Sequence, residues 1–194
     1  MAENKSLNIF KSVVPDIEAN PELIPSQFIK KYWSVFEQNY PDSESRGAVF
    51  ELMLAAVFCR NNLLPIYRGA KVAFVPGIIY DFVLYTKENG PIVFSAKTSL
   101  RERWKQADLE AVMLKNVHRK AQTYLVTLDS VATRTRKNRD EETMGIDNYI
   151  LADEEEFDNV ISGLKKLHFC EAPEIKVVES GTLITPANFR SHFS

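Results

Sequence analysis

The architecture of this chain of 194 residues can be inferred from one stretch, Ser95-Ala96-Lys97-Thr98-Ser99-Leu100-Arg101-Glu102-Arg103-Trp104. An apolar run that carries Asp81 precedes it, and a helical pattern that carries Glu110 follows it. The region therefore holds two carboxylates and a lysine, Lys97, that a hairpin and a helix can bring together. An Arg-Glu-Arg triplet begins four residues past the lysine.

A hairpin is expected immediately before this stretch. The runs Ile78–Thr86 and Ile92–Lys97 are rich in β-branched and aromatic residues, which favours strands. Between them lies Lys87-Glu88-Asn89-Gly90, in which Asn-Gly is a strong hairpin signal. Two antiparallel strands joined by a tight turn are therefore predicted.

The predicted register of that hairpin brings the charged side chains together. With the turn centred in the middle of the loop, Asp81 faces Ala96 or Lys97. Ser95 and Lys97 share one face, because side chains alternate along a strand. Glu110 lies on a polar face of the following helix, which must return over the sheet and can set Glu110 beside Asp81.

The remaining pattern predicts an α/β fold, with helices flanking one central mixed β-sheet. One domain at 1–194 is expected, made of an N-terminal helical arm at 1–45, a core at 46–168 and a C-terminal extension at 169–194. The expected helices are Ser26–Gln38, Arg46–Asn61, Ser99–His118 and Asp153–Leu167, the last N-capped by Asp153. The further expected strands are Lys71–Val75, Tyr124–Leu128, Asn148–Leu151 and Ile175–Val178.

Charge is unevenly distributed along the chain. The formal net charge is −2, so the chain as a whole is not a basic nucleic-acid binder. Basic residues nevertheless gather between Lys97 and Lys120 and between Arg134 and Arg139, whereas acidic ones gather at Asp140–Glu142 and Asp153–Asp158. One basic surface is compatible with this pattern. The Arg134–Arg139 segment is interpreted as a loop, which either grips phosphate or is simply solvated.

Composition and cysteine usage indicate a cytoplasmic protein. A hydrophobic content of 45% and a charged content of 26% are typical of soluble globular chains. We find no secretory signal and no apolar run long enough to span a bilayer. Cys59 and Cys170 form neither a disulfide framework nor a metal knuckle, and we expect two buried, reduced thiols.

The carboxylates and the lysine match the needs of phosphodiester hydrolysis. Hard oxygen ligands from Asp81 and Glu110 suit Mg²⁺, which keeps several waters and accepts phosphate oxygens. Such a metal lowers the pKa of a bound water, and Lys97 can orient that water and neutralise developing charge. The alternative is a hairpin with scattered charges, although an aspartate within an apolar strand is costly unless it is satisfied.

The triplet Arg101-Glu102-Arg103 suits the reading of G·C pairs. Arginine can bind the O6 and N7 atoms of guanine, and glutamate can accept from the N4 amine of cytosine. Taken alone, such a triplet is more often a solvated helix face.

Together, Asp81, Ser95-Ala96-Lys97, Arg101-Glu102-Arg103 and Glu110 resemble type II restriction endonucleases of the PD-(D/E)XK fold. They are most similar to the branch that cuts sites with a CC…GG core, in which serine replaces the strand carboxylate and a helix glutamate binds metal. The resemblance implies that Asp81 and Glu110 are metal ligands and that Lys97 is the catalytic lysine. Ser95 then occupies the vacated acid position, and the triplet reads C·G pairs.

The resemblance extends over roughly 46–128 and implies further roles. Glu51 looks like a supporting acid on the first core helix, or else it is a partly exposed helix glutamate. Tyr80 stands where the motif name expects proline. Trp33 is a candidate to support a flipped base, although its apolar helical stripe favours core packing.

The function implied by the resemblance is Mg²⁺-dependent cleavage of double-stranded DNA at a short palindromic G/C-rich site. A homodimer is expected, because each subunit reads half of a two-fold site. A cognate DNA methyltransferase is expected as a separate protein. The alternatives are a structure-selective repair or recombination nuclease of the same fold, or a DNA-binding module without catalytic activity.

Overall fold

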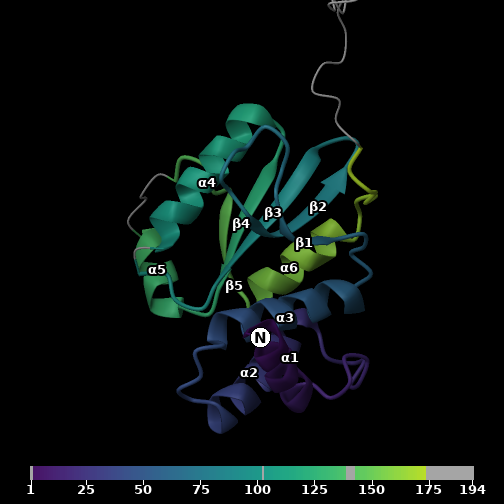
Figure 1. The fold of residues 1–194 in the computed structure, drawn as a ribbon, viewed down its shortest axis with the longest axis vertical. Helices are drawn as coiled ribbons and strands as arrows, with labels where there is room; N and C mark the ends of the chain where they lie inside the picture. The colour runs from purple at the N-terminus through teal and green to yellow at the C-terminus, as the bar shows by residue number, and fades with distance from the viewer. Residues whose placement is uncertain (1, 102, 139–142, 174–194) are drawn as a thin grey trace, which may run out of the picture.

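The computed structural model describes residues 2–101, 103–138 and 143–173, and its centre is a five-stranded sheet in the order β1-β2-β3-β4-β5 (Figure 1). Strands β1, β2 and β3 are antiparallel neighbours, whereas β3, β4 and β5 run parallel. The mixed sheet predicted from the sequence is therefore confirmed. The strands are Tyr67–Ala70 (β1), Tyr80–Thr86 (β2), Gly90–Lys97 (β3), Gln122–Thr127 (β4) and Asn148–Leu151 (β5).

Helices cover both faces of the sheet, as Figure 1 shows. On one face, apolar side chains of β2 and β3 pack against α3 and α6, with α1 and α2 lying beyond α3. On the other face, α4 and α5 pack against the sheet through a smaller cluster that includes Leu125 and Tyr149. The helices are Ala2–Val13 (α1), Pro25–Asn39 (α2), Arg46–Arg60 (α3), Arg103–Val117 (α4), Ser130–Asn138 (α5) and Glu155–Leu164 (α6).

Side chains of β3 alternate between the two faces of the sheet, so this one strand packs against helices on both sides. Phe94 and Ala96 belong to the large core that includes α3, whereas Val93 packs toward Leu114 of α4. Lys97 lies on the same face as Val93, because side chains two residues apart point the same way. Ala96 is still part of the core, and Lys97, the last residue of β3, is the one whose side chain is partly exposed to solvent.

Two predicted elements are wrong in position. The first strand is β1 at Tyr67–Ala70, whereas 71–75 ends in a turn in which the Val75 amide donates to the Val72 carbonyl at 3.2 Å. The edge strand β1 is only half-buried and shows no alternation of buried and exposed side chains, so the sequence pattern did not predict it. Helix α6 begins at Glu155 after an N-cap at Glu154, so the Asp153 cap is wrong.

Other expectations also need correction or confirmation. The segment expected as a loop at Arg134–Arg139 lies largely in helix α5, where Arg134 pairs with Glu154 at 2.9 Å. Both cysteines are free, but neither is buried as expected: Cys59 is exposed and Cys170 is only partly buried. Trp33 is buried and stacks on Phe36 with a ring-centroid distance of 4.9 Å, which confirms core packing. The predicted strand at Ile175–Val178 lies outside the described residues.

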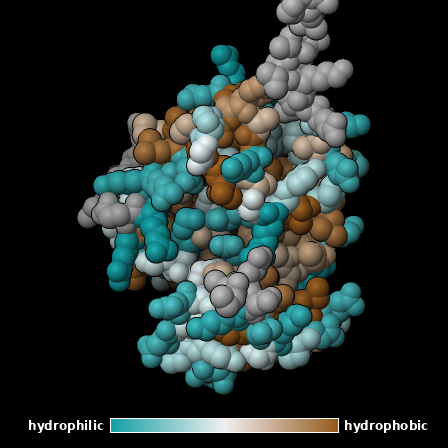
Figure 2. All heavy atoms as spheres, in the orientation of Figure 1, coloured by the Kyte–Doolittle hydropathy of each residue, from teal (hydrophilic) through white to brown (hydrophobic). Residues whose placement is uncertain are grey.

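The surface facing the viewer in Figure 2 is mixed, with hydrophobic patches set among hydrophilic side chains. Large exposed apolar side chains include Leu109 and Met113 of α4 and Phe74 and Ile79 of the segment before β2. None of the helices in the described ranges is both long and apolar enough to cross a membrane.

Candidate active site

The β2–β3 hairpin places Asp81 against the end of β3. Phe82 pairs with Phe94 and Thr86 with Gly90, so the hairpin is shifted by at least one residue from the predicted register. Continuing the observed pairing sets Asp81 opposite Ser95. The reason for the difference is the centre of the turn. Thr86 pairs with Gly90, so the turn is centred on Glu88 itself, slightly earlier in the chain than the predicted register assumes.

Asp81 is nevertheless satisfied by the two residues that the sequence predicted. Its Oδ2 atom accepts a hydrogen bond from the Ala96 amide at 2.7 Å. The same oxygen accepts from Nζ of Lys97 at 3.0 Å, which makes an ion pair across the two strands. An aspartate in an apolar strand is therefore held by two donors, as burial of a polar group requires.

Lys97 lies where the neighbouring parallel strands β3 and β4 end together. Lys97 on β3 pairs in register with Thr127, the last residue of β4. In α/β sheets, ligands bind outside the carboxyl ends of parallel strands, because the loops there diverge and leave a crevice. The side chain of Lys97 is therefore in a position to reach a substrate bound there.

Helix α3 adds a second carboxylate, Glu51, and strand β1 adds a second cationic side chain, Arg68. Glu51 of α3 pairs with the guanidinium of Arg68 at 3.6 Å, and its side chain is 28% exposed. Burial is the largest cause that raises the pKa of Glu51, followed by the negative charge of Asp81, while Arg68 and Lys97 act in the opposite direction. Glu51 and Asp81 therefore lie close enough for their charges to interact.

Arg68 is the member of this cluster that the sequence did not reveal. It lies on the short edge strand β1 and pairs with Phe82, next to Asp81 in the chain. No motif marks it, and the alternation of β1 is too weak to place its side chain. Only its proximity to Glu51 identifies it.

Glu110 lies on α4, next to Tyr80 rather than within the same cluster. Its carboxylate accepts from Nε2 of Gln106 at 2.8 Å, and its backbone carbonyl accepts from the Tyr80 hydroxyl at 3.0 Å. Burial, and secondarily the charge of Glu110, raises the pKa of Tyr80 well above its ordinary range. Glu110 is thus close to the residue that precedes Asp81.

Ser95 is buried beneath α4. It lines the narrow space between sheet and helix, together with Tyr80 and Ala107. A carboxylate at this position would be removed from water and costly to ionise. The uncharged side chain suits the site, and the acids of the cluster come from β2 and α3 instead.

The predicted reading triplet lies at the start of α4. Arg101 and Arg103 are both exposed, whereas Leu100 before them is fully buried. Arg101 has a positive φ of 24°, and the Arg103 amide donates to the Leu100 carbonyl at 2.7 Å. Helix α4 therefore begins at Arg103 rather than at the predicted Ser99. Glu102 lies outside the described residues.

The donor set fits a divalent cation in part. Asp81 and Glu51 supply two neighbouring carboxylates whose mutual repulsion a cation would relieve. Mg²⁺ needs only one or two protein carboxylates, because it keeps several waters and takes oxygens from substrate. In the part of the chain that the structure describes, no three histidine, cysteine or acidic side chains come together as a ready-made metal site.

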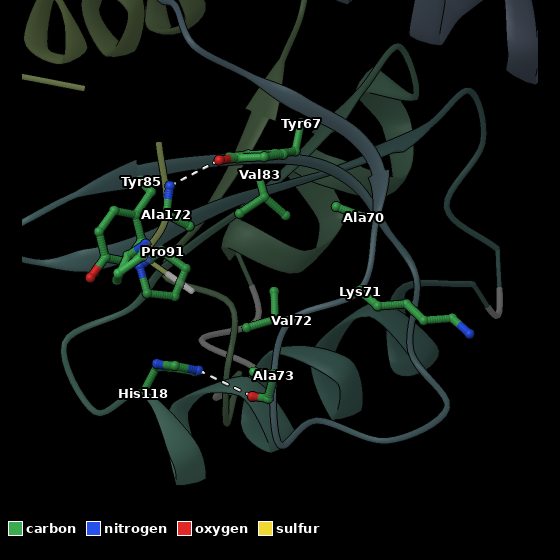
Figure 3. Close-up of a pocket in the computed structure, with 12 residues that line it drawn as sticks. Tyr67, Ala70, Lys71, Val72, Ala73, Val83, Tyr85, Pro91, His118 and Ala172 are labelled. Carbon is green, nitrogen blue, oxygen red and sulfur yellow. Dashed lines mark hydrogen bonds between the residues drawn. The ribbon is translucent and has the colours of Figure 1, made fainter. Parts of the chain in front are cut away.

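A separate pocket lies at the far end of the hairpin, near the turn (Figure 3). It encloses about 350 Å³ and is mostly apolar, with Tyr67, Val83, Tyr85 and Pro91 among its lining residues. Figure 3 shows His118 on its rim, where Nε2 lies 3.4 Å from the Ala73 carbonyl. The pocket contains none of the predicted site residues, so the charged cluster around Lys97 remains the candidate active site.

Comparison with known proteins supports the architecture. No family model matches the chain, and no curated protein sequence matches it. The solved structure of the restriction endonuclease PspGI in complex with substrate DNA is similar, with a TM-score of 0.58 and 14% sequence identity. The similarity covers 84% of this chain and 82% of that one. The fold is therefore restriction-endonuclease-like, as the sequence predicted.

Proposed function

We propose that this chain is a type II restriction endonuclease that hydrolyses double-stranded DNA at a short palindromic G/C-rich site of the CC…GG type, with Mg²⁺ as cofactor. The observation that carries the proposal is the Lys97–Asp81 ion pair, at 3.0 Å, at the end of the parallel strands of a restriction-endonuclease-like fold. Fold alone does not determine activity, so the proposal depends on this local chemistry.

Each charged residue of the cluster has a proposed role. Bound Mg²⁺ would supply a water of lowered pKa and charge stabilisation at phosphorus. Asp81 and Glu51 would hold the cation, and Glu110 is the proposed further ligand, which must release Gln106 to serve. Lys97 would orient the attacking water and offset the negative charge that develops on the phosphate.

We propose that the triplet Arg101-Glu102-Arg103, which follows Lys97 in the chain, recognises the DNA bases. The exposed Arg101 and Arg103 can each present a bidentate guanidinium to guanine, and Glu102 can accept from cytosine. These side chains lie a few residues from Lys97, so one segment would carry both the cutting and the reading groups. Buried Leu100 anchors the segment between them.

A homodimer is proposed because a palindromic site presents two identical half-sites. Sedimentation velocity of the free protein and of its complex with a DNA duplex tests this. A dimer in the complex is expected, and a monomer in both states would contradict a two-fold assembly. A cognate DNA methyltransferase, encoded as a separate protein, would protect the host sites.

Plasmid cleavage tests the activity. The purified protein is incubated with unmethylated plasmids of known sequence, with Mg²⁺ or with EDTA. Lys97→Ala is compared with Lys115→Ala, because Lys115 forms a similar pair with Asp147 away from the site. We expect discrete Mg²⁺-dependent fragments from wild type and Lys115→Ala and none from Lys97→Ala.

The other outcomes separate the alternatives. Cleavage confined to junctions, flaps or ends would indicate a structure-selective nuclease of the same fold. DNA binding without cleavage on any substrate, and unchanged by Lys97→Ala, would indicate a binding module without catalytic activity.

A further inference from the structure

Asp129 binds the residues that connect the proposed catalytic lysine to the proposed reading arginines. It follows β4 by two residues, and the last residue of β4, Thr127, is paired in register with Lys97. The Asp129 amide is fixed by Thr127, whose Oγ1 accepts from it at 3.1 Å. The carboxylate therefore projects from the point at which β3 and β4 end together.

The two carboxylate oxygens of Asp129 bind two different segments. Oδ2 accepts from the Leu100 amide at 3.1 Å and from the Ser99 hydroxyl at 3.4 Å. Oδ1 accepts from the Ala132 amide at 3.1 Å, which caps the first turn of α5. One side chain thus joins the segment after Lys97 to the start of α5.

This contact fixes the backbone from which the reading arginines extend. Leu100 is held by Asp129 at its amide and by burial of its side chain. Its carbonyl accepts from the Arg103 amide at 2.7 Å, which closes a turn around Arg101 with its positive φ of 24°. Removal of the Asp129 contact would free the turn that carries both guanidiniums.

We propose that Asp129 is a positioning residue for sequence discrimination, which sets the reading arginines in register with Lys97. This inference rests on the proposed function. Bidentate recognition of guanine is directional, so a shift of the turn by about 1 Å weakens the distinction between correct and incorrect bases. The carboxylate acts through the Leu100 amide and does not itself contact DNA.

Asp129→Asn tests the proposal with little change in shape. The amide keeps one acceptor oxygen but turns the other acceptor into a donor, so one of the two segments loses its partner. Asp147→Asn is the matched control, because Asp147 accepts from the Thr123 amide at 2.8 Å at the opposite end of β4. Both variants remove one negative charge near an end of β4 and weaken a hydrogen bond that a backbone amide donates to the carboxylate.

Two measurements are made on the full chain. Hydrogen exchange of the free protein should become faster at 98–104 in Asp129→Asn and stay at the wild-type rate there in Asp147→Asn. The ratio of cleavage rates on cognate and single-base-altered duplexes should fall about tenfold in Asp129→Asn, in line with the loss of one good base contact, and remain unchanged in Asp147→Asn.

The outcomes distinguish this inference from the proposed function. Asp129→Ala removes both acceptor oxygens and is the second variant. Wild-type exchange at 98–104 in both Asp129→Asn and Asp129→Ala overturns the positioning role, whatever the enzyme cuts. Faster exchange with an unchanged discrimination ratio, in a protein that cuts specifically, overturns the link to specificity. A wild-type protein that cuts no DNA overturns the proposed function, and the specificity role of Asp129 with it, even where the exchange result is as expected.

Discussion

Lys97 and Asp81 form an ion pair across β2 and β3, with Nζ 3.0 Å from Oδ2 and about one fifth of each side chain exposed, at 20% and 21%. Because the pair is partly buried, dissolved salt screens its attraction less than that of a fully exposed pair. The Ala96 amide binds the same Asp81 oxygen, so neither of these two donors uses the second carboxylate oxygen, Oδ1. The pair thus combines a fixed lysine with a carboxylate that keeps coordinating capacity.

Replacement of Asp81 by asparagine should abolish cleavage while the protein still binds DNA. Loss of the carboxylate removes a proposed ligand and the partner of Lys97, and we expect a fall in cleavage rate of about 100-fold or more. Affinity for DNA without metal should stay equal or rise, because one negative charge is removed. Single-turnover cleavage and fluorescence anisotropy measure the two effects, and a wild-type cleavage rate in Asp81→Asn would exclude Asp81 from the chemistry.

Arg103→Ala should weaken specific binding and relax base discrimination. One bidentate contact to guanine is worth about 1–3 kcal/mol, so affinity for the cognate duplex should fall roughly 5- to 150-fold. Arg134→Ala is the control, since Arg134 is exposed on α5 and pairs with Glu154. Its effect should be small and similar on all sequences, and equal losses on cognate and altered duplexes in Arg103→Ala would rule out base reading.

Glu51→Gln should change the pH dependence of stability. Burial and the charge of Asp81 raise the pKa of Glu51 above its ordinary 4.5, so ionisation of Glu51 costs folding free energy. The contribution of Glu51 to stability is fully present below the pKa that Glu51 has in the unfolded chain. It is lost as pH rises through the raised pKa that Glu51 has in the folded protein. The variant should therefore gain stability relative to wild type as pH rises from about 4 to about 8, as urea unfolding would show. A stability difference that is constant over this range would contradict the raised pKa.

Gly145→Ala should destabilise the fold. A Cβ atom at Gly145 would lie 2.4 Å from the Val112 amide nitrogen of α4, which is backbone and cannot rotate away. We expect a loss of about 1–3 kcal/mol, the usual cost of overpacking a core. Gly163→Ala is the matched control, because a Cβ there meets no atom within 4 Å and the helix α6 should gain about 0.5–1 kcal/mol. Thermal and urea unfolding of both variants measure the difference.

The hairpin and the parallel strands were predictable because their signals are local. Asn89-Gly90 indicated the turn, and the strand at Asn148–Leu151 was predicted with the observed bounds. Asp81 lies opposite Ser95, and Lys97 is two residues further along β3 on the same face, so the long lysine side chain still reaches Asp81 although the predicted register was wrong.

The remaining features depend on contacts between residues far apart in the sequence. Asp108 on α4 is buried and accepts from the Gly145 and Ile146 amides at 2.9 Å and 3.0 Å, and no sequence pattern marks an acid with backbone partners. Arg68 was missed for the same reason, since its partner lies on α3. Helix α5 was missed because its mean hydropathy is low and it shows little apolar face.

The short connection between Lys97 and Arg103 limits the geometry of any DNA complex. Six residue steps span at most about 20 Å even when fully extended. At about 3.4 Å per base pair, this corresponds to roughly six base pairs of duplex. On the proposed function, the scissile bond should therefore lie within roughly six base pairs of the bases that Arg103 reads. Cleavage at a remote distance would require an insertion between these two residues.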